Sequence, residues 1–223
     1  MSFLSALTAK PWLPEPPPAL ATGPATPAAR VALRVLLAVI ATLFGLFLLA
    51  FLIRAQLPDW QTLAGAPGRP LANLAPLWIN TALLLASSIA LQAASAAARR
   101  DIAARLRGAL ALGAFFTLAF LLGQGWLWWR FIELGHFVAS NPAASFFCLL
   151  TGVHGLHLAG GLVAWSRVFA RAAHGVAPQR LRLAVDLCAR YWHFLFAVWL
   201  VLFALLASPP QTLRVLAEIC GIR

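Results

Sequence analysis

Two histidines within an apolar stretch are the first feature of this sequence that could do chemistry. His154 and His157 lie near the middle of residues 146–161, in a segment apolar enough to cross a membrane. A charged group at that depth costs roughly 2.5–3.5 kcal/mol, so these histidines are expected to stay neutral and to need a partner. The sequence allows three roles for them, namely metal binding, proton transfer, or hydrogen bonding between helices.

A third candidate histidine follows two charged residues on a later apolar segment. Asp186, Arg190 and His193 share one helical face. Asp186 and Arg190 are four residues apart, which predicts an ion pair, and Asp186 precedes the expected helix, where a negative charge is favourable. His157 and His193 have similar predicted depths, so two antiparallel neighbouring helices could bring them together. A bis-histidine haem needs such an opposed pair, whereas hydrogen bonding between helices needs only one partner for each histidine.

Small and aromatic residues predict how these segments pack. Gly152, Gly155 and Ala159 fall on the face opposite the histidines of their segment, where they would let another helix come close. Trp192 and Trp199 lie on one stripe of the last apolar segment, and we expect them to pack against other helices.

The composition places the chain in a membrane. Of its 223 residues, 62% are hydrophobic and 10% are charged, and the mean hydropathy is +0.85. Long apolar runs recur, as in polytopic helical membrane proteins. We therefore predict an all-α bundle of five transmembrane helices, at about residues 31–53, 77–97, 109–129, 142–168 and 187–207. Asn141 followed by Pro142 predicts the start of the fourth helix, with the asparagine as its cap.

The remaining segments and the basic residues predict the topology. Residues 1–29 are rich in proline and are expected to form a flexible tail, residues 30–208 the transmembrane domain, and residues 209–223 a short tail that could include a surface helix. Most Lys and Arg residues fall in segments on the N-terminal side of the membrane. This bias predicts a cytoplasmic N-terminus and a periplasmic C-terminus. The net charge of +11 is thus interpreted as lipid contact and topology, with no nucleic-acid partner.

Several motifs in order along the chain resemble those of one family, subunit III of the haem-copper terminal oxidases. They are the segment 80–88 (Asn-Thr-Ala-Leu-Leu-Leu-Ala-Ser-Ser), Gln124, the segment 146–157 that ends in His-Gly-Leu-His, and Tyr191-Trp192-His193-Phe194 followed by Val198-Trp199. Asp186 falls where the family usually has a glutamate. The resemblance covers about residues 77–207, and five spans resemble the short bacterial form of the family. Leu127 and Phe196 replace two carboxylates that are common in the family, so a proton-handling role does not carry over to these two positions.

The resemblance implies a subunit of a respiratory oxidoreductase that holds no redox centre itself. Such a subunit would pack directly on subunit I, with subunit II and a small subunit IV in the same complex. It would bind phospholipid and help to sustain proton uptake during oxygen reduction in the bacterial cytoplasmic membrane. Haems and copper are expected in the partner subunits. The positions that match the family's motifs predict an intramembrane polar or lipid-linked network: His154, His157, His193, Gln124, Asp186 and Arg190.

The residue inventory favours the same role. Five histidines, of which two lie in predicted loops, cannot supply the axial ligands of two haems and a three-histidine copper site. The three cysteines (Cys148, Cys188 and Cys220) lie far apart, so the chain lacks the close pair of a dinuclear copper centre. Four alternatives stay open: a quinol oxidase subunit, a nitric-oxide-reductase-associated subunit, a b-type haem electron carrier, and a transporter.

Overall fold

The described parts of the chain are helical. The computed structural model describes residues 26–63, 71–133 and 141–221, and these ranges contain no strand. Almost the whole predicted N-terminal tail lies outside them. The helices are α2 (Thr26–Arg54), α3 (Ala75–Arg99), α4 (Ala103–Glu133), α5 (Pro142–Ala173), α6 (Pro178–Leu206) and α7 (Pro210–Ile219). The first five are long and apolar enough to cross a membrane, which confirms the predicted fold class.

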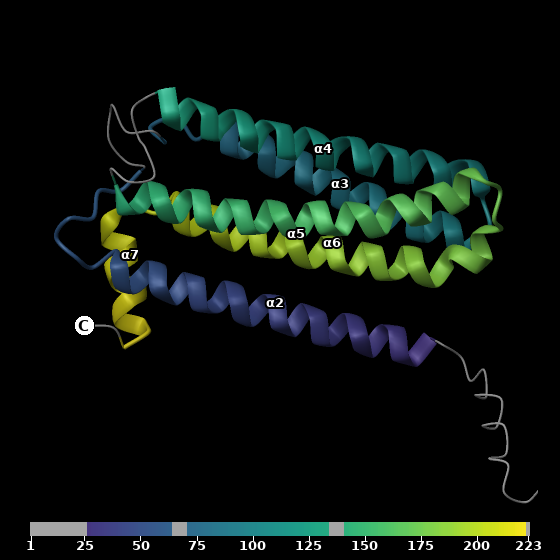
Figure 1. Cartoon of the computed structure of the whole chain (residues 1–223), viewed down its shortest axis with the longest axis horizontal. Coiled ribbons are helices and arrows are strands. Elements are labelled where there is room, and N and C mark those ends of the chain that lie inside the picture. Colours follow the sequence, from purple (N-terminus) through teal and green to yellow (C-terminus); the bar gives the residue numbers. More distant parts are fainter. Residues whose placement is uncertain (1–25, 64–70, 134–140, 222–223) are drawn as a thin grey trace, which may run out of the picture.

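The five long helices lie side by side, with α6 in a central position (Figure 1). α3 packs along both α4 and α6, and α6 also contacts α5 and α2. α2 runs along the far side of α5 and α6, away from α3 and α4, and the short α7 crosses the bundle end beside the C-terminal end of α2. Because α6 also reaches α4 through its tryptophans, its side chains contact all four other long helices.

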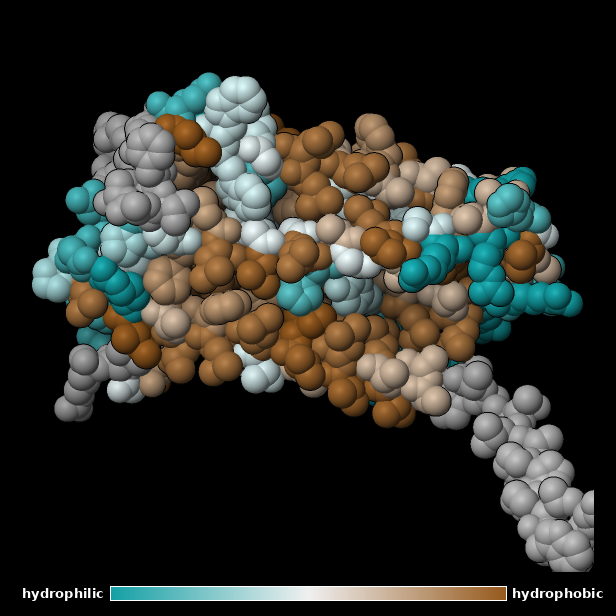
Figure 2. Space-filling view, in the orientation of Figure 1, coloured by the Kyte–Doolittle hydropathy of each residue, from teal (hydrophilic) through white to brown (hydrophobic). Residues whose placement is uncertain are grey.

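Hydrophobic side chains cover the middle of the visible surface, and hydrophilic ones gather at its two ends (Figure 2). α2 is the most peripheral span. Of its most apolar stretch of 18 residues 22% is buried, compared with 56% for the corresponding stretch of α3. Val39 and Leu46 on α2, and Phe115 and Leu122 on α4, are among the large apolar side chains that are exposed. Such surfaces are stable only in lipid or against another protein.

Most helices extend beyond the apolar runs that predicted them. α6 begins at Pro178 rather than near Leu187, and α5 continues to Ala173. Hydropathy marks the part of a helix that suits the hydrocarbon, whereas alanine, leucine and arginine continue the helix into the headgroup region. The C-terminal tail contains α7, a helix of 10 residues.

Local capping explains two helix ends. The Asn141 side chain accepts a hydrogen bond from the backbone N–H of Ala143 at 2.9 Å, with Pro142 at the first helical position, as predicted. At the other end of α5, Gly175 has φ +80°, and the Val176 N–H bonds to the Arg171 carbonyl at 3.1 Å. This is a Schellman ending, which favours glycine and turns the chain directly into α6.

Large aromatic side chains fill the interior where three or four helices meet. Trp165 and Trp192 pack edge to face with ring centroids 4.6 Å apart, and Phe120 and Trp199 do so at 4.8 Å. Between membrane helices such packing matters more than apolar burial, because lipid tails are as apolar as the protein interior. Each aromatic pair contributes about 0.5–1.5 kcal/mol.

Candidate functional site

His154 lies at the centre of the bundle, inside a shell of aromatic rings. It is fully buried on α5, and its ring centroid lies 5.5 Å from that of Trp199, 5.9 Å from Phe120 and 6.3 Å from Phe44. Neither ring nitrogen has a hydrogen-bond partner among the described residues. The rings come from α6, α4 and α2, so His154 joins these helices through aromatic packing rather than through the expected hydrogen bonds.

His157 lies one turn further along α5 and faces α2. Its Nδ1–H donates to the Val153 carbonyl of the same helix at 2.7 Å, and its ring centroid is 5.6 Å from that of Phe44. The Tyr191 hydroxyl of α6 donates to the His157 backbone carbonyl at 3.0 Å. The side chain is thus held by its own helix, and its backbone supplies the bond between helices.

His193 faces α3, away from the other two histidines. Its Nδ1 lies 2.5 Å from Ser88 Oγ, and its Nε2 lies 3.1 Å from Gln92 Oε1. Because the amide oxygen can only accept, Nε2–H donates to Gln92. The Ser88 hydroxyl can donate or accept, so it suits Nδ1 in either role. His157 contacts α2 and His193 contacts α3, so the opposed pair that a bis-histidine haem needs is not formed.

Asp186 connects α6 to α3 rather than pairing within its own helix. It accepts from the Ser95 hydroxyl and forms an ion pair with Arg99 at 3.2 Å. Arg190 is exposed and makes no ion pair with any described residue, so the predicted Asp186–Arg190 pair is not present. Because α6 starts at Pro178, Asp186 lies within the helix rather than at its N-terminus, and Ser95 and Arg99 of α3 supply the partners of its carboxylate.

Gln124 pairs with a residue outside the predicted set. Its side-chain oxygen accepts from Asn80 Nδ2 of α3 at 3.1 Å, and both side chains are buried. Gly123, the preceding residue, leaves room for Asn80, because a Cβ there would collide with the asparagine oxygen. Five of the six predicted polar residues therefore belong to separate contacts, of which those of His193 and Asp186 both join α6 to α3, and Arg190 has no ion pair among the described residues.

Three tryptophan–threonine bonds hold the helices together. The indole N–H donates to a threonine hydroxyl in each pair: Trp192 to Thr117 at 3.1 Å, Trp199 to Thr81 at 2.9 Å and Trp128 to Thr151 at 3.0 Å. Each threonine in turn donates to the carbonyl four residues earlier in its own helix. These bonds join α6 to α4, α6 to α3, and α4 to α5. Threonines and tryptophans within the apolar runs are the sequence signal for these bonds.

The predicted small-residue face of α5 is packed less closely than the surroundings of Gly113 and Gly161. A Cβ on Gly152 or Gly155 would meet only side-chain atoms of α4 at 3.6 Å, which is ordinary contact, and Ala159 is exposed. The close approaches are at Gly113, where a Cβ would lie 2.5 Å from Trp165, and at Gly161, where it would lie 2.7 Å from Tyr191. Tryptophan and tyrosine rings, rather than another backbone, fill these spaces.

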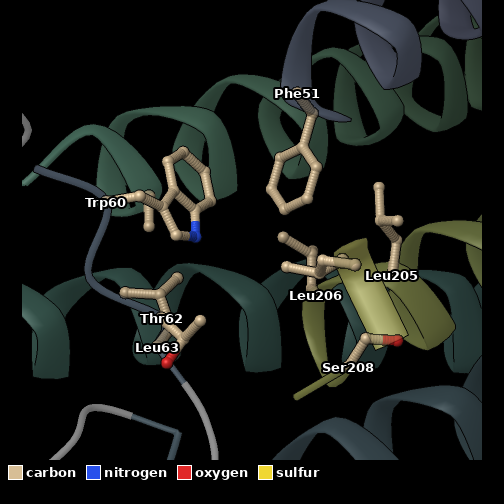
Figure 3. Close-up of a pocket in the computed structure, with 9 residues that line it drawn as sticks. Phe51, Trp60, Thr62, Leu63, Leu205, Leu206 and Ser208 are labelled. Atoms are coloured by element: carbon tan, nitrogen blue, oxygen red, sulfur yellow. The ribbon is translucent and has the colours of Figure 1, made fainter. Parts of the chain in front are cut away.

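Two pockets differ in what they can hold. A pocket of about 280 Å³ opens between α2, α5 and α6, and it is lined by Leu33, Leu36, Gly160, Gly161, Ala164, Leu187, Cys188, Tyr191 and Trp192. A second pocket lies at the other end of the bundle, where the Trp60 indole faces Thr62 and Leu206 (Figure 3). Its volume of about 10 Å³ is too small for a lipid or a cofactor.

Comparisons with known proteins give one consistent result. A family model described as cytochrome c oxidase subunit III matches residues 23–207. A probable cytochrome c oxidase subunit 3 of Mycobacterium leprae is 34% identical over 164 residues, which are 73% of this chain and 78% of the relative. Cytochrome c oxidase subunit 3 of Synechocystis is 32% identical over 166 residues, with 74% and 68% covered. A probable subunit 3 of Nocardia farcinica is 33% identical over 165 residues, with 72% and 77% covered.

Proposed function

The chain belongs to the cytochrome c oxidase subunit III family, and we propose that it is the membrane partner that stabilises the oxygen-reducing subunit of its oxidase. Membership makes it a multi-pass bacterial membrane protein and a component of an oxidase complex, and the family carries no redox centre. The proposal concerns which subunit it contacts and what the contact does. We infer direct packing on subunit I, which would hold the haems and copper, with subunit II and a small subunit IV in the same complex.

The observation that carries a structural rather than a redox role is the separation of the three span histidines. His154 is enclosed by aromatic rings, His157 bonds to its own helix, and His193 bonds to two side chains of α3. The rings and side chains that these histidines contact all come from the helices of the bundle itself. No set of three or more metal-ligating side chains occurs together in the part of the chain that the structure describes.

Phospholipid binding is supported by the pocket between α2, α5 and α6. Its volume of about 280 Å³ and its lining of leucine, glycine, alanine and aromatic residues suit an acyl chain rather than a polar ligand. A lipid held there would fill the space beside α2, which is the least buried span. In our proposal, subunit III and its lipids shield the proton-entry side of subunit I and so sustain proton uptake over many turnovers.

The orientation and the electron donor also belong to the proposal. Basic residues gather at the bundle end that carries the α3–α4 and α5–α6 connections, with Arg100 between helices and Arg105, Arg171 and Arg180 in the adjoining helix turns. The positive-inside rule assigns this end to the cytoplasm together with the N-terminus. The names of the curated relatives favour cytochrome c as the electron donor of the complex. Quinol oxidation or an association with nitric oxide reduction is the alternative, and purified complex assayed with each substrate distinguishes them.

The test compares oxidase purified with and without this chain. We expect both preparations to have the same haem content and the same initial rate, while the preparation without the chain loses activity faster during continuous turnover. Restoring the gene should restore the slower loss. Equal inactivation of the two preparations would refute the proposed role, and a pyridine haemochrome spectrum of the isolated chain that shows haem would refute its non-redox character.

A further inference from the structure

One surface of the bundle combines exposed polar groups with exposed apolar groups at membrane depth. We call it the α3–α6 face and define it by Leu85, Ile89, Gln92, His193, Ala197 and Leu200. All six are exposed in the isolated chain, and they lie along the line where α3 and α6 meet. The Ser88–His193 and Gln92–His193 contacts hold the two helices together there.

Gln92 cannot be satisfied by lipid at this position. It lies seven residues before Arg99, about 10 Å along the helix from the charged end of α3. Its side-chain oxygen is used by His193, and its amide nitrogen has no partner among the described residues. Hydrocarbon offers no acceptor for the two amide hydrogens, so leaving them there is unfavourable.

The outward faces of α2 and α4 expose mainly apolar side chains in the middle of the span. α2 exposes Val39 and Leu46, and α4 exposes Phe115 and Leu122, all bulky apolar side chains. Thr42 is an exposed polar side chain on α2, and its hydroxyl donates to the Ala38 carbonyl of the same helix at 3.0 Å. An open amide group therefore distinguishes the α3–α6 face from the residues named on α2 and α4.

Small residues on and beside this face permit another helix to approach. Ala82 and Ala93 on α3, and Ala197 and Ala204 on α6, are exposed. Alanine and other small residues mark contact surfaces between membrane helices, because they bring the two backbones close together. Exposed alanines also occur on α2 (Ala41) and α4 (Ala111), so the small residues allow a helix to approach this face but do not by themselves distinguish it.

A positive charge at one end of the face indicates the sign of the charge that the partner presents there. Arg190 lies one turn from His193, is exposed, and has no ion pair with a described residue. The neighbouring carboxylate of Asp186 is already paired with Arg99. A partner that covers Arg190 would best present a carboxylate at that level.

We propose that the α3–α6 face is the surface that binds the oxygen-reducing subunit. The contacting element is an apolar transmembrane helix that presents a hydrogen-bond acceptor to Gln92 and an acidic side chain to Arg190. This inference rests on the proposed function, because that function supplies the partner. Beyond the proposed function, the inference identifies which outward face of the bundle the partner subunit covers and which faces contact lipid.

Tryptophan substitutions at exposed alanines test the face without disturbing the interior. Ala197→Trp places a bulky ring on the α3–α6 face, and Ala41→Trp and Ala111→Trp place the same ring on exposed positions of α2 and α4. The tagged full chain is expressed with its complex, and the haem recovered per chain is measured after a detergent wash. We expect Ala197→Trp to lower this ratio about tenfold or more and the two controls to leave it unchanged. Circular dichroism should show equal helix content for the wild type and the three variants.

A second pair of variants tests the hydrogen bond. Gln92→Leu removes the amide and should lower the haem ratio several-fold, whereas Thr42→Val, a control on α2, should not. Loss of haem with Ala41→Trp or Ala111→Trp, but not with Ala197→Trp, would overturn the assignment of the face while leaving the proposed function intact. Absence of haem from the wild-type preparation would instead refute the proposed function.

Discussion

Two adjacent glycines on α5 offer a matched test of the α5–α6 packing. A Cβ added to Gly161 would lie 2.7 Å from Tyr191 Cε1 and 2.8 Å from the Trp192 ring, both on α6. A Cβ added to Gly160 would meet nothing within 4 Å. The two substitutions Gly161→Ala and Gly160→Ala therefore make the same chemical change at consecutive residues of one helix, and differ only in what the new methyl group meets.

The expected free energies follow from two opposing effects. Replacing glycine by alanine within a helix stabilises it by about 0.8–1 kcal/mol, because the unfolded chain loses freedom. Forcing a methyl group into a closely packed site costs about 1–3 kcal/mol, because the rings must move. Gly160→Ala should therefore be stabilising by up to about 1 kcal/mol, and Gly161→Ala should be neutral or destabilising by up to about 2 kcal/mol.

The measurement is the free energy of unfolding of each variant in mixed micelles, from a titration with sodium dodecyl sulfate followed by circular dichroism. Near-ultraviolet spectra would also report any movement of Trp192 in Gly161→Ala. If the two variants are stabilised equally, the close contact between Gly161 and the two rings does not exist. The packing of α6 against α5 described above would then be incorrect.

Three further predictions concern polar contacts. Thr117→Val keeps the side-chain volume but removes the acceptor of the Trp192 indole, so it should lower the free energy of unfolding in the same titration by about 1 kcal/mol. Hydrogen bonding by Arg54 lowers the pKa of Asp59. The ion pair is therefore fully formed above the ordinary pKa of the carboxyl, and it is lost as the pH falls through the lower pKa of Asp59 in the folded chain. The chemical shift of the Asp59 carboxyl carbon should report this pKa, and Arg54→Gln should raise the pKa. Asp186→Leu removes the carboxylate that links α6 to α3 and should be destabilising by about 1 kcal/mol, measured in the same micelles.

Each of these predictions has a control in the same chain. Thr42→Val removes an exposed hydroxyl that bonds only to its own helix, so it should change stability far less than Thr117→Val. Glu133→Gln neutralises an exposed carboxylate at the end of α4 and should leave stability unchanged, in contrast to Asp186→Leu. A shift of the Asp59 pKa that persists in Arg54→Gln would contradict the stated cause.

Features that depend on neighbouring residues in the sequence could be predicted well. Apolar runs predicted the five spans, because only helices of that length satisfy their backbone groups within a membrane. Asn141 and Pro142 predicted the start of α5, because capping involves residues two or three positions apart. The resemblance of residues 146–157 to one family was likewise local, and the family comparison agrees with it.

Features that depend on how helices are rotated against each other could not be predicted from spacing. Asp186 lies four residues from Arg190, yet it pairs with Arg99, which is 87 residues away in sequence. Gly161 lies outside the predicted face of Gly152, Gly155 and Ala159, yet it is the glycine of α5 that the rings of α6 approach closely. The partners of Gln124 and His193 are side chains of α3, and nothing in the periodicity of a single helix identifies which neighbour it faces.

The lengths of the helices bear on the kind of bilayer that suits this protein. α4 has 31 residues and α5 has 32, which correspond to about 46 and 48 Å, whereas the hydrocarbon layer is about 30 Å thick. The excess lets the hydrocarbon boundary slide along the helices without exposing a break in backbone hydrogen bonding. Reconstitution into lipids with longer acyl chains should therefore be tolerated, and thickness mismatch should be accommodated by the protruding turns rather than by deforming the bundle.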